Sequence, residues 1–224
     1  MWRLEGQHRA AGWSTIAGVD EAGRGALAGP VAVGAVILAA DWQPRAYRDS
    51  KTLSAGQRER LALEIKLEAV AWAVEFASAQ EVDEYGVLNA TKRASLRALA
   101  QLEPQPDALI TDYLKLETGL PILAPPRADS NSYSVAAASI LAKTARDAFM
   151  LELHDQFPEY GFAGHKGYGA ASHLEALRTF GACFEHRRSF RPVALVIDGL
   201  FSEARVFETA KSEVESLQGV SGKR

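Results

Sequence analysis

Residues 14–38 read STIAGVDEAGRGALAGPVAVGAVIL, and this stretch decides the fold class of the chain. Residues 14–21 have a β-type pattern, a glycine-rich turn follows, and residues 29–38 are apolar at both alternating sets of positions. A strand with two apolar faces is covered by other structure on both sides of its sheet. We therefore predict two strands joined by a tight turn, of which the second is fully buried.

Outward from this stretch, the chain alternates between helical and β-type patterns. Residues 54–70 have apolar positions at helical spacing with Ser54 as the N-cap, and residues 134–157 are rich in Ala, Leu, Ile and Met. Further helices are predicted at residues 86–102, 172–180 and 202–217, and further strands at residues 71–77, 107–111 and 121–124. A loop is predicted at residues 158–168 and a basic connector at residues 186–192. This order predicts a mixed α/β core followed by a mostly helical C-terminal region.

Length and composition restrict the classes of protein. A chain of 224 residues with 47% hydrophobic residues suits one main core with a short appendage. No apolar stretch reaches the roughly 18 residues that span a bilayer, and the first residues lack the pattern of a signal peptide. Cys183 is the single cysteine, which excludes an internal disulfide. We therefore expect a cytoplasmic, monomeric protein without membrane association.

The charge of the chain gives arguments both against and for a nucleic-acid partner. The formal net charge is -3, whereas proteins that bind nucleic acids usually carry a basic surface. Residues 166–191 nevertheless contain five Lys and Arg side chains against two acids, which predicts a local basic face. His165 and His186 stand beside Lys166 and Arg187, so we expect these two histidines to have surface or phosphate-contacting roles.

The glycine-rich turn, residues 23–29, nearly matches the fingerprint of dinucleotide-binding folds. Its third glycine is one position late, and Pro30 leads into a strand rather than into the helix that would hold a pyrophosphate. Two interpretations remain. The turn is either an ordinary strand connection or a tight loop whose glycines admit a bulky ligand while Arg24 reaches a phosphate or a base edge.

Four carboxylates stand where predicted strands or helices begin or end. Asp20 and Glu21 end the first strand, Asp112 follows an apolar run, and Asp129 precedes the long helix. Each has an ordinary alternative, since acids beside turns are often only solvated and Asp129 suits a helix cap. Asp20 and Glu21 can serve one site only if the backbone twists or ends there, which the following glycines permit.

The residue types of this set suit a metal site. Carboxylate oxygens without a histidine cluster are the ligands of hard cations such as Mg²⁺ or Mn²⁺. Two such ions, held roughly 3.5–4 Å apart, activate water and stabilise the leaving oxygen in phosphodiester hydrolysis. The four acids are therefore candidate ligands for divalent cations.

Several ordered motifs together resemble the type 2 ribonucleases H, the ribonuclease HII family. The N-terminal signature is Gly18-Val19-Asp20-Glu21-Ala22-Gly23-Arg24-Gly25, followed by Gly29-Pro30. Further matches are Asp49-Ser50-Lys51, Asp112, residues 137–143 with Arg146-Asp147, residues 164–169 (GHKGYG) and residues 186–190 (HRRSF). The first dozen residues and the tail after about Asp198 lie outside the resemblance.

The resemblance implies an α/β protein with an RNase H-like fold, in which helices flank a central mixed β-sheet and a helical C-terminal extension follows. It implies a catalytic core at residues 1–157 and a helical region at residues 158–224 that completes the substrate site. It also implies that two divalent ions, Mg²⁺ or Mn²⁺, are held by four catalytic acids, which fall on Asp20, Glu21, Asp112 and Asp129.

The resemblance further implies how the substrate is recognised. The family's Gly-Arg-Gly loop, here Gly23, Arg24 and Gly25, reads the ribose 2′-OH beside the scissile phosphate, and its tyrosine, here Tyr168, packs on the deoxyribose that follows. The implied activity is cleavage of the RNA strand of RNA/DNA hybrids, and incision 5′ to ribonucleotides embedded in duplex DNA. Candidate phosphate contacts are Lys51, Lys143 and Lys166, although Lys143 could equally pair with Asp147. Arg187 and Arg188 could brace the two regions.

Two departures and two rival functions complete the sequence evidence. Arg127 stands where lysine is usual before Asp129, and Ala26 stands where proline often follows the Gly-Arg-Gly loop, but neither removes a candidate ligand. A catalytically silent nucleic-acid-binding module would have no reason to keep four acids beside a phosphate backbone. A carboxylate-pair glycosidase would act without metal and use aromatic platforms, whereas the four tryptophans lie far from the acids in the sequence.

Overall fold

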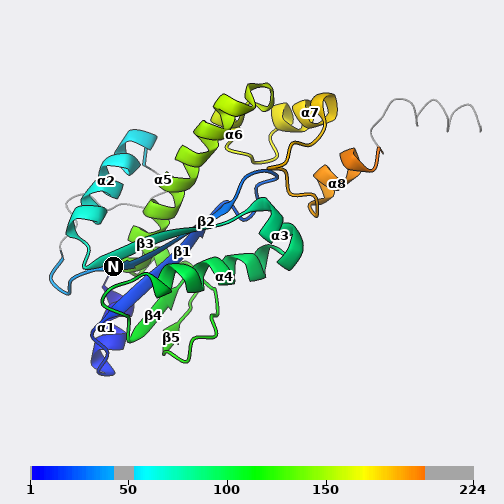
Figure 1. Cartoon of the computed structure of the whole chain (residues 1–224). Helices are drawn as coiled ribbons and strands as arrows, with labels where there is room; N and C mark the ends of the chain where they lie inside the picture. The colour runs from blue at the N-terminus through cyan, green and yellow to red at the C-terminus, as the bar shows by residue number, and fades with distance from the viewer. Residues whose placement is uncertain (1, 43–52, 200–224) are drawn as a thin grey trace, which may run out of the picture.

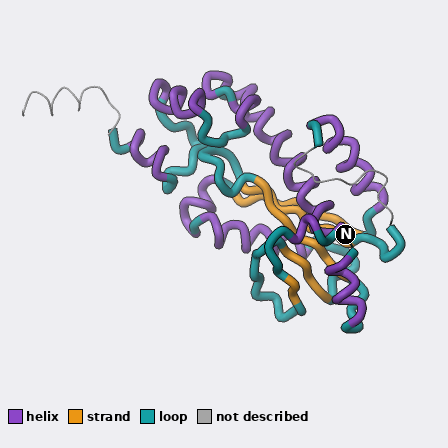
Figure 2. The backbone as a smooth tube through the Cα atoms, turned by 180° about the vertical axis from the view of Figure 1, so that it is seen from behind, coloured by secondary structure: helices purple, strands orange, loops and turns teal. Residues whose placement is uncertain are grey.

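A mixed β-sheet lies at the centre of the computed structural model, which describes residues 2–42 and 53–199 (Figure 1, Figure 2). The strands are β1 (Ile16–Ala22), β2 (Val31–Ile37), β3 (Ala71–Ala77), β4 (Ala108–Thr111) and β5 (Ile122–Leu123). Their order in the sheet is β3-β2-β1-β4-β5. β1 pairs antiparallel with β2 and β2 with β3, whereas β1 and β4, and β4 and β5, are parallel. The predicted mixed sheet is therefore confirmed.

Helices cover both faces of this sheet, as Figure 1 shows. On one face lie α2 (Ala55–Glu68) and α5 (Tyr133–Gln156), and on the other lie α3 (Ala79–Tyr85) and α4 (Val87–Ala100). All seven residues of β2 are buried, and they alternate between the two layers. Val33 belongs to the same buried cluster as Ala94 of α4, and Val36 to the same buried cluster as Ile140 of α5. The prediction of a strand with two apolar faces is thus confirmed.

Two glycines let α5 approach the sheet closely. A Cβ on Gly18 would lie 2.2 Å from the backbone carbonyl carbon of Ser134, and one on Gly34 would lie 2.3 Å from the carbonyl oxygen of Ala138. Both contacts are with helix backbone, which cannot rotate away as a side chain can. The lack of side chains at these two positions therefore sets how near α5 lies to β1 and β2.

Capping side chains determine where two of the helices begin. Ser54 is the N-cap of α2, as predicted, and forms a capping box with Gln57. α5 begins after Ser132, whose Oγ accepts a hydrogen bond from Val135 N at 3.1 Å. Ser132, rather than Asp129, is therefore the cap of the long helix.

Several elements differ from the expected ones. Two helices, α1 (Arg3–Ala10) and α3, have no counterpart among the predicted helices. The segment expected to be a loop contains a short helix, α6 (Phe162–His165), and α8 (Arg191–Ile197) begins inside the expected connector. α7 (Ala171–Phe180) lies close to its predicted range, and the helix predicted at 202–217 lies outside the described residues. Among residues 2–42 and 53–199, no helix is long and apolar enough to cross a membrane.

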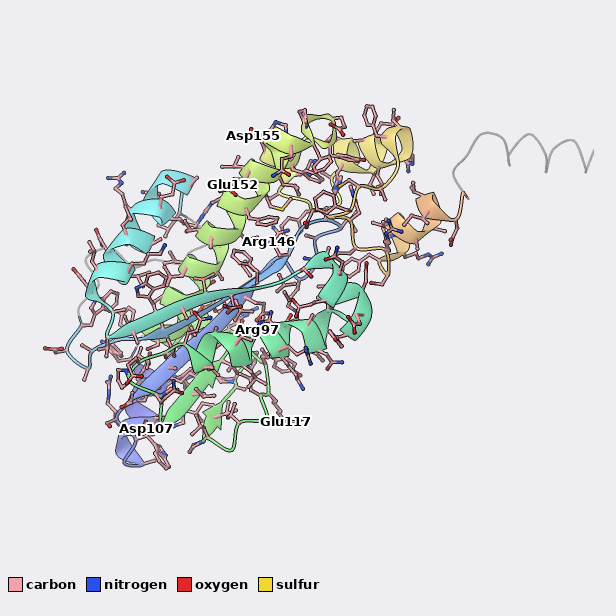
Figure 3. All side chains as sticks on the ribbon, in the orientation of Figure 1. Arg97, Asp107, Glu117, Arg146, Glu152 and Asp155 are labelled. Carbon is pink, nitrogen blue, oxygen red and sulfur yellow. The ribbon has the colours of Figure 1, made fainter. Side chains whose placement is uncertain are left out.

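Two buried arginines fasten the C-terminal region to the core. Arg187 Nη1 donates to the carbonyl oxygen of Arg24 at 2.9 Å. Arg146, which lies on α5 beside the β1–β2 connection (Figure 3), donates from Nε to the carbonyl oxygen of Pro30 at 2.9 Å and from Nη1 to that of Lys166 at 3.0 Å. Arg187 thus braces the two regions, as predicted. Because it is fully buried, it does not contribute to the basic face expected in this region.

Candidate active site

Strand register brings Asp20 and Asp112 side by side. Val19 of β1 is paired with Thr111 of the parallel strand β4, and each aspartate is the next residue of its chain segment. Side chains at the carboxyl ends of parallel strands share one edge of the sheet, where α/β proteins often keep their sites. The two carboxylates interact, because the charge of Asp112 contributes to raising the pKa of Asp20. The structure therefore places the two aspartates in one site.

The environment of Asp20 disfavours a negative charge. Its side chain is buried, and the hydroxyl of Ser139 on α5 donates a hydrogen bond to it. Burial, with a further contribution from the Glu21 carboxylate, raises the pKa of Asp20 to about 7, while the Ser139 hydrogen bond acts in the opposite direction. A bound cation would offset this unfavourable charge. The oxygen donors present here thus fit a divalent cation.

Glu21 lies on the wall of a cavity of about 490 Å³. Its Oε1 accepts a hydrogen bond from Arg24 Nη1 at 2.9 Å. Burial raises the pKa of Glu21, and the Arg24 guanidinium opposes this shift. The cavity is lined by Glu21, Ala22, Gly23, Arg24, Gly25, Arg58, Ser139, Lys143 and Tyr168. The end of β1, the glycine loop, two helices and the tyrosine loop therefore converge on one space.

Asp129 lies in the segment that contacts Asp112. Asp112 Oδ1 accepts a hydrogen bond from Ala128 N at 3.1 Å, and Asp129 follows in the 3₁₀ turn that Ala128 begins. Among the residues that the structure describes, no three His, Cys, Asp or Glu side chains are gathered so that they could hold a metal ion. The acids are therefore neighbours rather than a preassembled set of ligands, since like charges repel and Glu21 is paired with Arg24.

The glycine loop takes its shape from buried side chains. Gly23 has a φ of 94°, and a Cβ at this position would lie 1.9 Å from Arg146 Nε. Only glycine combines this backbone conformation with so close an approach. Arg187 holds the carbonyl oxygen of Arg24, and the Arg24 side chain extends to the cavity wall. The loop thus borders a cavity, which is the geometry that the second interpretation of this turn requires.

Tyr168 reaches the same cavity from a distant part of the chain. Its ring is 40% exposed, and the Arg146 guanidinium carbon lies 5.3 Å from the ring centroid. The neighbouring Gly167 accepts a hydrogen bond from Leu27 N at 2.8 Å, and a Cβ on Gly167 would lie 2.4 Å from the carbonyl oxygen of Ala28. This close backbone contact brings Tyr168 beside the Gly-Arg-Gly loop.

The three lysines predicted to contact phosphates are placed differently. Lys143 lines the cavity and pairs with Asp147, with 2.5 Å between Nζ and Oδ1. Lys166 donates to the carbonyl oxygen of Ala163 and is not among the residues that line the cavity. Lys51 lies outside the described residues. The expected pairing of Lys143 with Asp147 is thus present, and it lies at the edge of the cavity.

Some residues of the site have no local sequence signal. Arg58, on α2, lines the cavity, and its Nη2 lies 3.7 Å from Asp147 Oδ2. Ser139 lies within a matched motif, but only the packing of α5 against β1 shows that it contacts Asp20. Only the packing of α2 against α5 identifies Arg58 as a residue of the site.

The expectation for the two histidines is wrong for His186, whereas His165 is only half-buried. His186 is 1% exposed, and its Nε2 lies 3.1 Å from Nε2 of His173. His165 uses both ring nitrogens within the protein, since Nε2 lies 2.8 Å from the carbonyl oxygen of Tyr160 and Nδ1 accepts from Gly167 N at 3.2 Å. Cationic neighbours in the sequence do not determine which way a ring points, and the His186 ring lies in the interior.

Comparison with known proteins agrees with this geometry. The sequence profile of the family described as Ribonuclease HII matches residues 17–193, which is most of the chain. The chain belongs to the ribonuclease HII family. It is 56% identical over 179 residues to Ribonuclease HII of Thermus thermophilus, covering 80% of this chain and 87% of that protein. It is 46% identical over 200 residues to Ribonuclease HII of Shouchella clausii, covering 89% and 77%.

Solved ribonuclease structures share the fold. Ribonuclease H2 from Pyrococcus horikoshii superposes with a TM-score of 0.71 and 25% identity, covering 84% of this chain and 98% of that one. A ribonuclease HII from Archaeoglobus fulgidus, solved in complex with PCNA, gives a TM-score of 0.68 and 27% identity, covering 81% and 96%. The expected RNase H-like fold is therefore confirmed. As a member of the ribonuclease HII family, the chain is an endoribonuclease that acts on RNA/DNA hybrids. This activity rules out the two rival functions, a glycosidase and a catalytically silent binding module.

Proposed function

We propose that this ribonuclease HII cleaves the RNA strand of hybrids and also incises duplex DNA on the 5′ side of an embedded ribonucleotide. The reaction uses two divalent cations and leaves 3′-hydroxyl and 5′-phosphate ends. The observation that carries the proposal is one cavity lined by Glu21, the Gly-Arg-Gly loop and Tyr168, beside which the carboxylates of Asp20 and Asp112 interact. Removal of single ribonucleotides from DNA is the role that such an activity would serve.

The candidate cation ligands are Asp20, Glu21, Asp112 and Asp129. Carboxylate oxygens are the donors that Mg²⁺ and Mn²⁺ prefer. Burial and the neighbouring carboxylates disfavour the charge of Asp20, and this cost is offset when a cation is present. When bound, two such ions would activate a water molecule and stabilise the leaving 3′ oxygen. No side-chain nucleophile is then required.

Arg24 is the candidate contact to the phosphate next to the cleaved bond. Its side chain is 45% exposed at the cavity wall and is paired with Glu21. A guanidinium presents two parallel N–H groups, which match the geometry of a phosphate. A cation held by Glu21 would compete with Arg24 for this carboxylate and would leave the guanidinium available to the phosphate.

Two features of the cavity support selection of an RNA-to-DNA junction. Nothing lies within 4 Å of the position that a Cβ on Gly25 would take, so a sugar can approach the backbone of the loop there, where a ribose 2′-OH finds hydrogen-bonding groups. The Tyr168 ring lies on the same cavity and offers a flat surface to the next sugar. A 2′-OH on that sugar would be crowded against the ring, so a deoxyribose is preferred there.

The test uses end-labelled duplex DNA that contains one ribonucleotide, incubated with Mg²⁺, Mn²⁺ or a chelator. An all-DNA duplex and a continuous RNA/DNA hybrid are treated in parallel. Asp112→Asn removes a candidate ligand, and Asp155→Asn, at the exposed far end of α5 (Figure 3), is the matched control. We expect metal-dependent incision 5′ to the ribonucleotide by the wild type and by Asp155→Asn, and a loss of at least about 100-fold in Asp112→Asn.

The possible failures are distinguishable. Incision in the presence of chelator, or equal rates for the two variants, would reject the metal site. Cleavage of the continuous hybrid without incision at a single ribonucleotide would reject the junction specificity and leave the hybrid-cleaving activity in place.

A further inference from the structure

A chain of imidazoles lies behind Tyr168 and has no part in the proposed chemistry. His173 is fully buried, and its Nε2 lies 3.1 Å from Nε2 of the equally buried His186. The other nitrogen of His173, Nδ1, lies 2.8 Å from the carbonyl oxygen of Tyr168. His165 stacks on His173 with ring centroids 4.4 Å apart. The chain therefore ends on the backbone of the residue proposed to contact the substrate sugar.

The partners of these rings determine which nitrogens carry hydrogen. The backbone N–H of Cys183 donates to His186 Nδ1 at 3.1 Å, so the hydrogen of a neutral His186 is on Nε2. His186 Nε2 then donates to His173 Nε2, which leaves the hydrogen of His173 on Nδ1, facing the Tyr168 carbonyl oxygen. Burial lowers the pKa of His186 to about 4 and also lowers the pKa of His173. Both rings are therefore neutral at neutral pH, as this arrangement requires.

The backbone of Tyr168 is held on both sides. Tyr168 N donates to the carbonyl oxygen of His165 at 3.0 Å, and the Tyr168 carbonyl oxygen accepts from His173 and from Ala170 N, the latter at 2.8 Å. The preceding Gly167 has a φ of 80°, so the chain turns sharply just before the tyrosine. The direction in which the ring enters the cavity depends on how firmly this turn is held.

We propose that His173, oriented by His186, is a positioning residue that holds the Tyr168 backbone and thereby determines how strictly the enzyme selects a deoxyribose after the ribonucleotide. This inference rests on the proposed role of Tyr168 at the RNA-to-DNA junction. His173 touches no substrate in this arrangement and acts through the tyrosine alone. The readout is therefore selectivity between substrates, which a purely structural role would not change.

Two amide variants of His173 separate the hydrogen bond from the loss of the ring. In His173→Asn, the side-chain amide lies near the former Nδ1 and can still donate to Tyr168. In His173→Gln, it lies near the former Nε2, and the donor to Tyr168 is lost. The selectivity is the ratio of kcat/KM on a duplex with one embedded ribonucleotide to kcat/KM on a continuous hybrid. We expect this ratio to fall about five-fold in His173→Gln, since one neutral hydrogen bond is lost, and to be largely kept in His173→Asn.

A double-mutant cycle tests whether the effect passes through the tyrosine. Tyr168→Ala is expected to lower the ratio, and His173→Gln added to it is expected to lower the ratio no further. His186 offers an independent pair should the His173 variants fail to fold. His186→Gln keeps a hydrogen-bond donor to His173 near the former Nε2, so the selectivity ratio is expected to stay the same. His186→Asn loses this donor, so the ratio is expected to fall.

Three results would overturn the inference. The first is an equal ratio for the Asn and Gln variants at either histidine. The second is a full effect of His173→Gln in the Tyr168→Ala background. The third is a wild-type ratio near unity, which would reject the preference for a junction ascribed to Tyr168 and this inference with it, while incision at the ribonucleotide and metal-dependent hybrid cleavage would both stand.

Discussion

Replacement of Gly34 by alanine tests whether the close approach of α5 builds the acid site. Gly34 is paired with Asp20 across β1 and β2, and an added Cβ would lie 2.3 Å from the carbonyl oxygen of Ala138. Ordinary contacts begin near 3.4 Å, so α5 must move away by about an ångström. Ser139 is the next residue of the helix, and its hydroxyl moves away from Asp20 with it.

The expected effects follow from these contacts. Overpacking against a rigid backbone costs about 1–3 kcal/mol of unfolding free energy. In a protein of 224 residues, each kcal/mol lowers the melting temperature by roughly 2–4 °C. Loss of the Ser139 hydrogen bond to the Asp20 carboxylate is expected to raise the activation free energy of cleavage by about 1.5 kcal/mol, which corresponds to roughly ten-fold slower cleavage.

Urea unfolding and hybrid cleavage at saturating Mg²⁺ measure the two effects. Gly6→Ala is the control, because Gly6 is an exposed residue of α1 with nothing within 4 Å of an added Cβ. This variant is expected to be more stable by about 0.5–1 kcal/mol and fully active. If Gly34→Ala kept both its unfolding free energy and its cleavage rate, the reasoning about α5 would be refuted.

Three further predictions concern buried charges. Asp20→Asn is expected to abolish cleavage and to stabilise the metal-free protein at neutral and alkaline pH. The stability that the Asp20 carboxyl group contributes is full below pH 3.8 and is lost as pH rises through about 7, where the buried group becomes charged. Urea midpoints at acid and alkaline pH measure this difference, and an equal pH dependence in the two proteins would contradict it. His186 acts in the opposite sense: stability is lost as pH falls from 6.5 to about 4, by roughly 3 kcal/mol in total. His186→Gln should therefore reduce the slope of the urea midpoints in this range, with His173 giving the remainder, and an unchanged slope would count against the assignment. Arg187→Lys loses the guanidinium hydrogen bonds to the Gly29 and Arg24 carbonyl oxygens and is expected to lower the free energy of unfolding by roughly 2–3 kcal/mol, with unchanged metal dependence of cleavage. An unchanged urea midpoint would show that Arg187 is not a brace.

Local patterns predicted those features that depend on neighbouring residues. The two apolar faces of residues 29–38 indicated a fully buried strand, and Ser54 marked the start of α2. The pattern of α3 is only seven residues long, too short to show a helical period, and that helix has no counterpart in the prediction. His186 was assigned to the surface because its sequence neighbours are charged, yet its ring lies against His173 in the interior.

The sequence alone determined the family, the chemical nature of the acids and the glycine loop, because these depend on residue type and order. Only the tertiary structure decided that Asp112 lies beside Asp20, since this depends on the register of β1 against β4. It also decided the approach of α5 over Gly34 and the imidazole chain behind Tyr168. These arrangements join segments far apart in the chain, and packing between such segments has no local pattern to predict it.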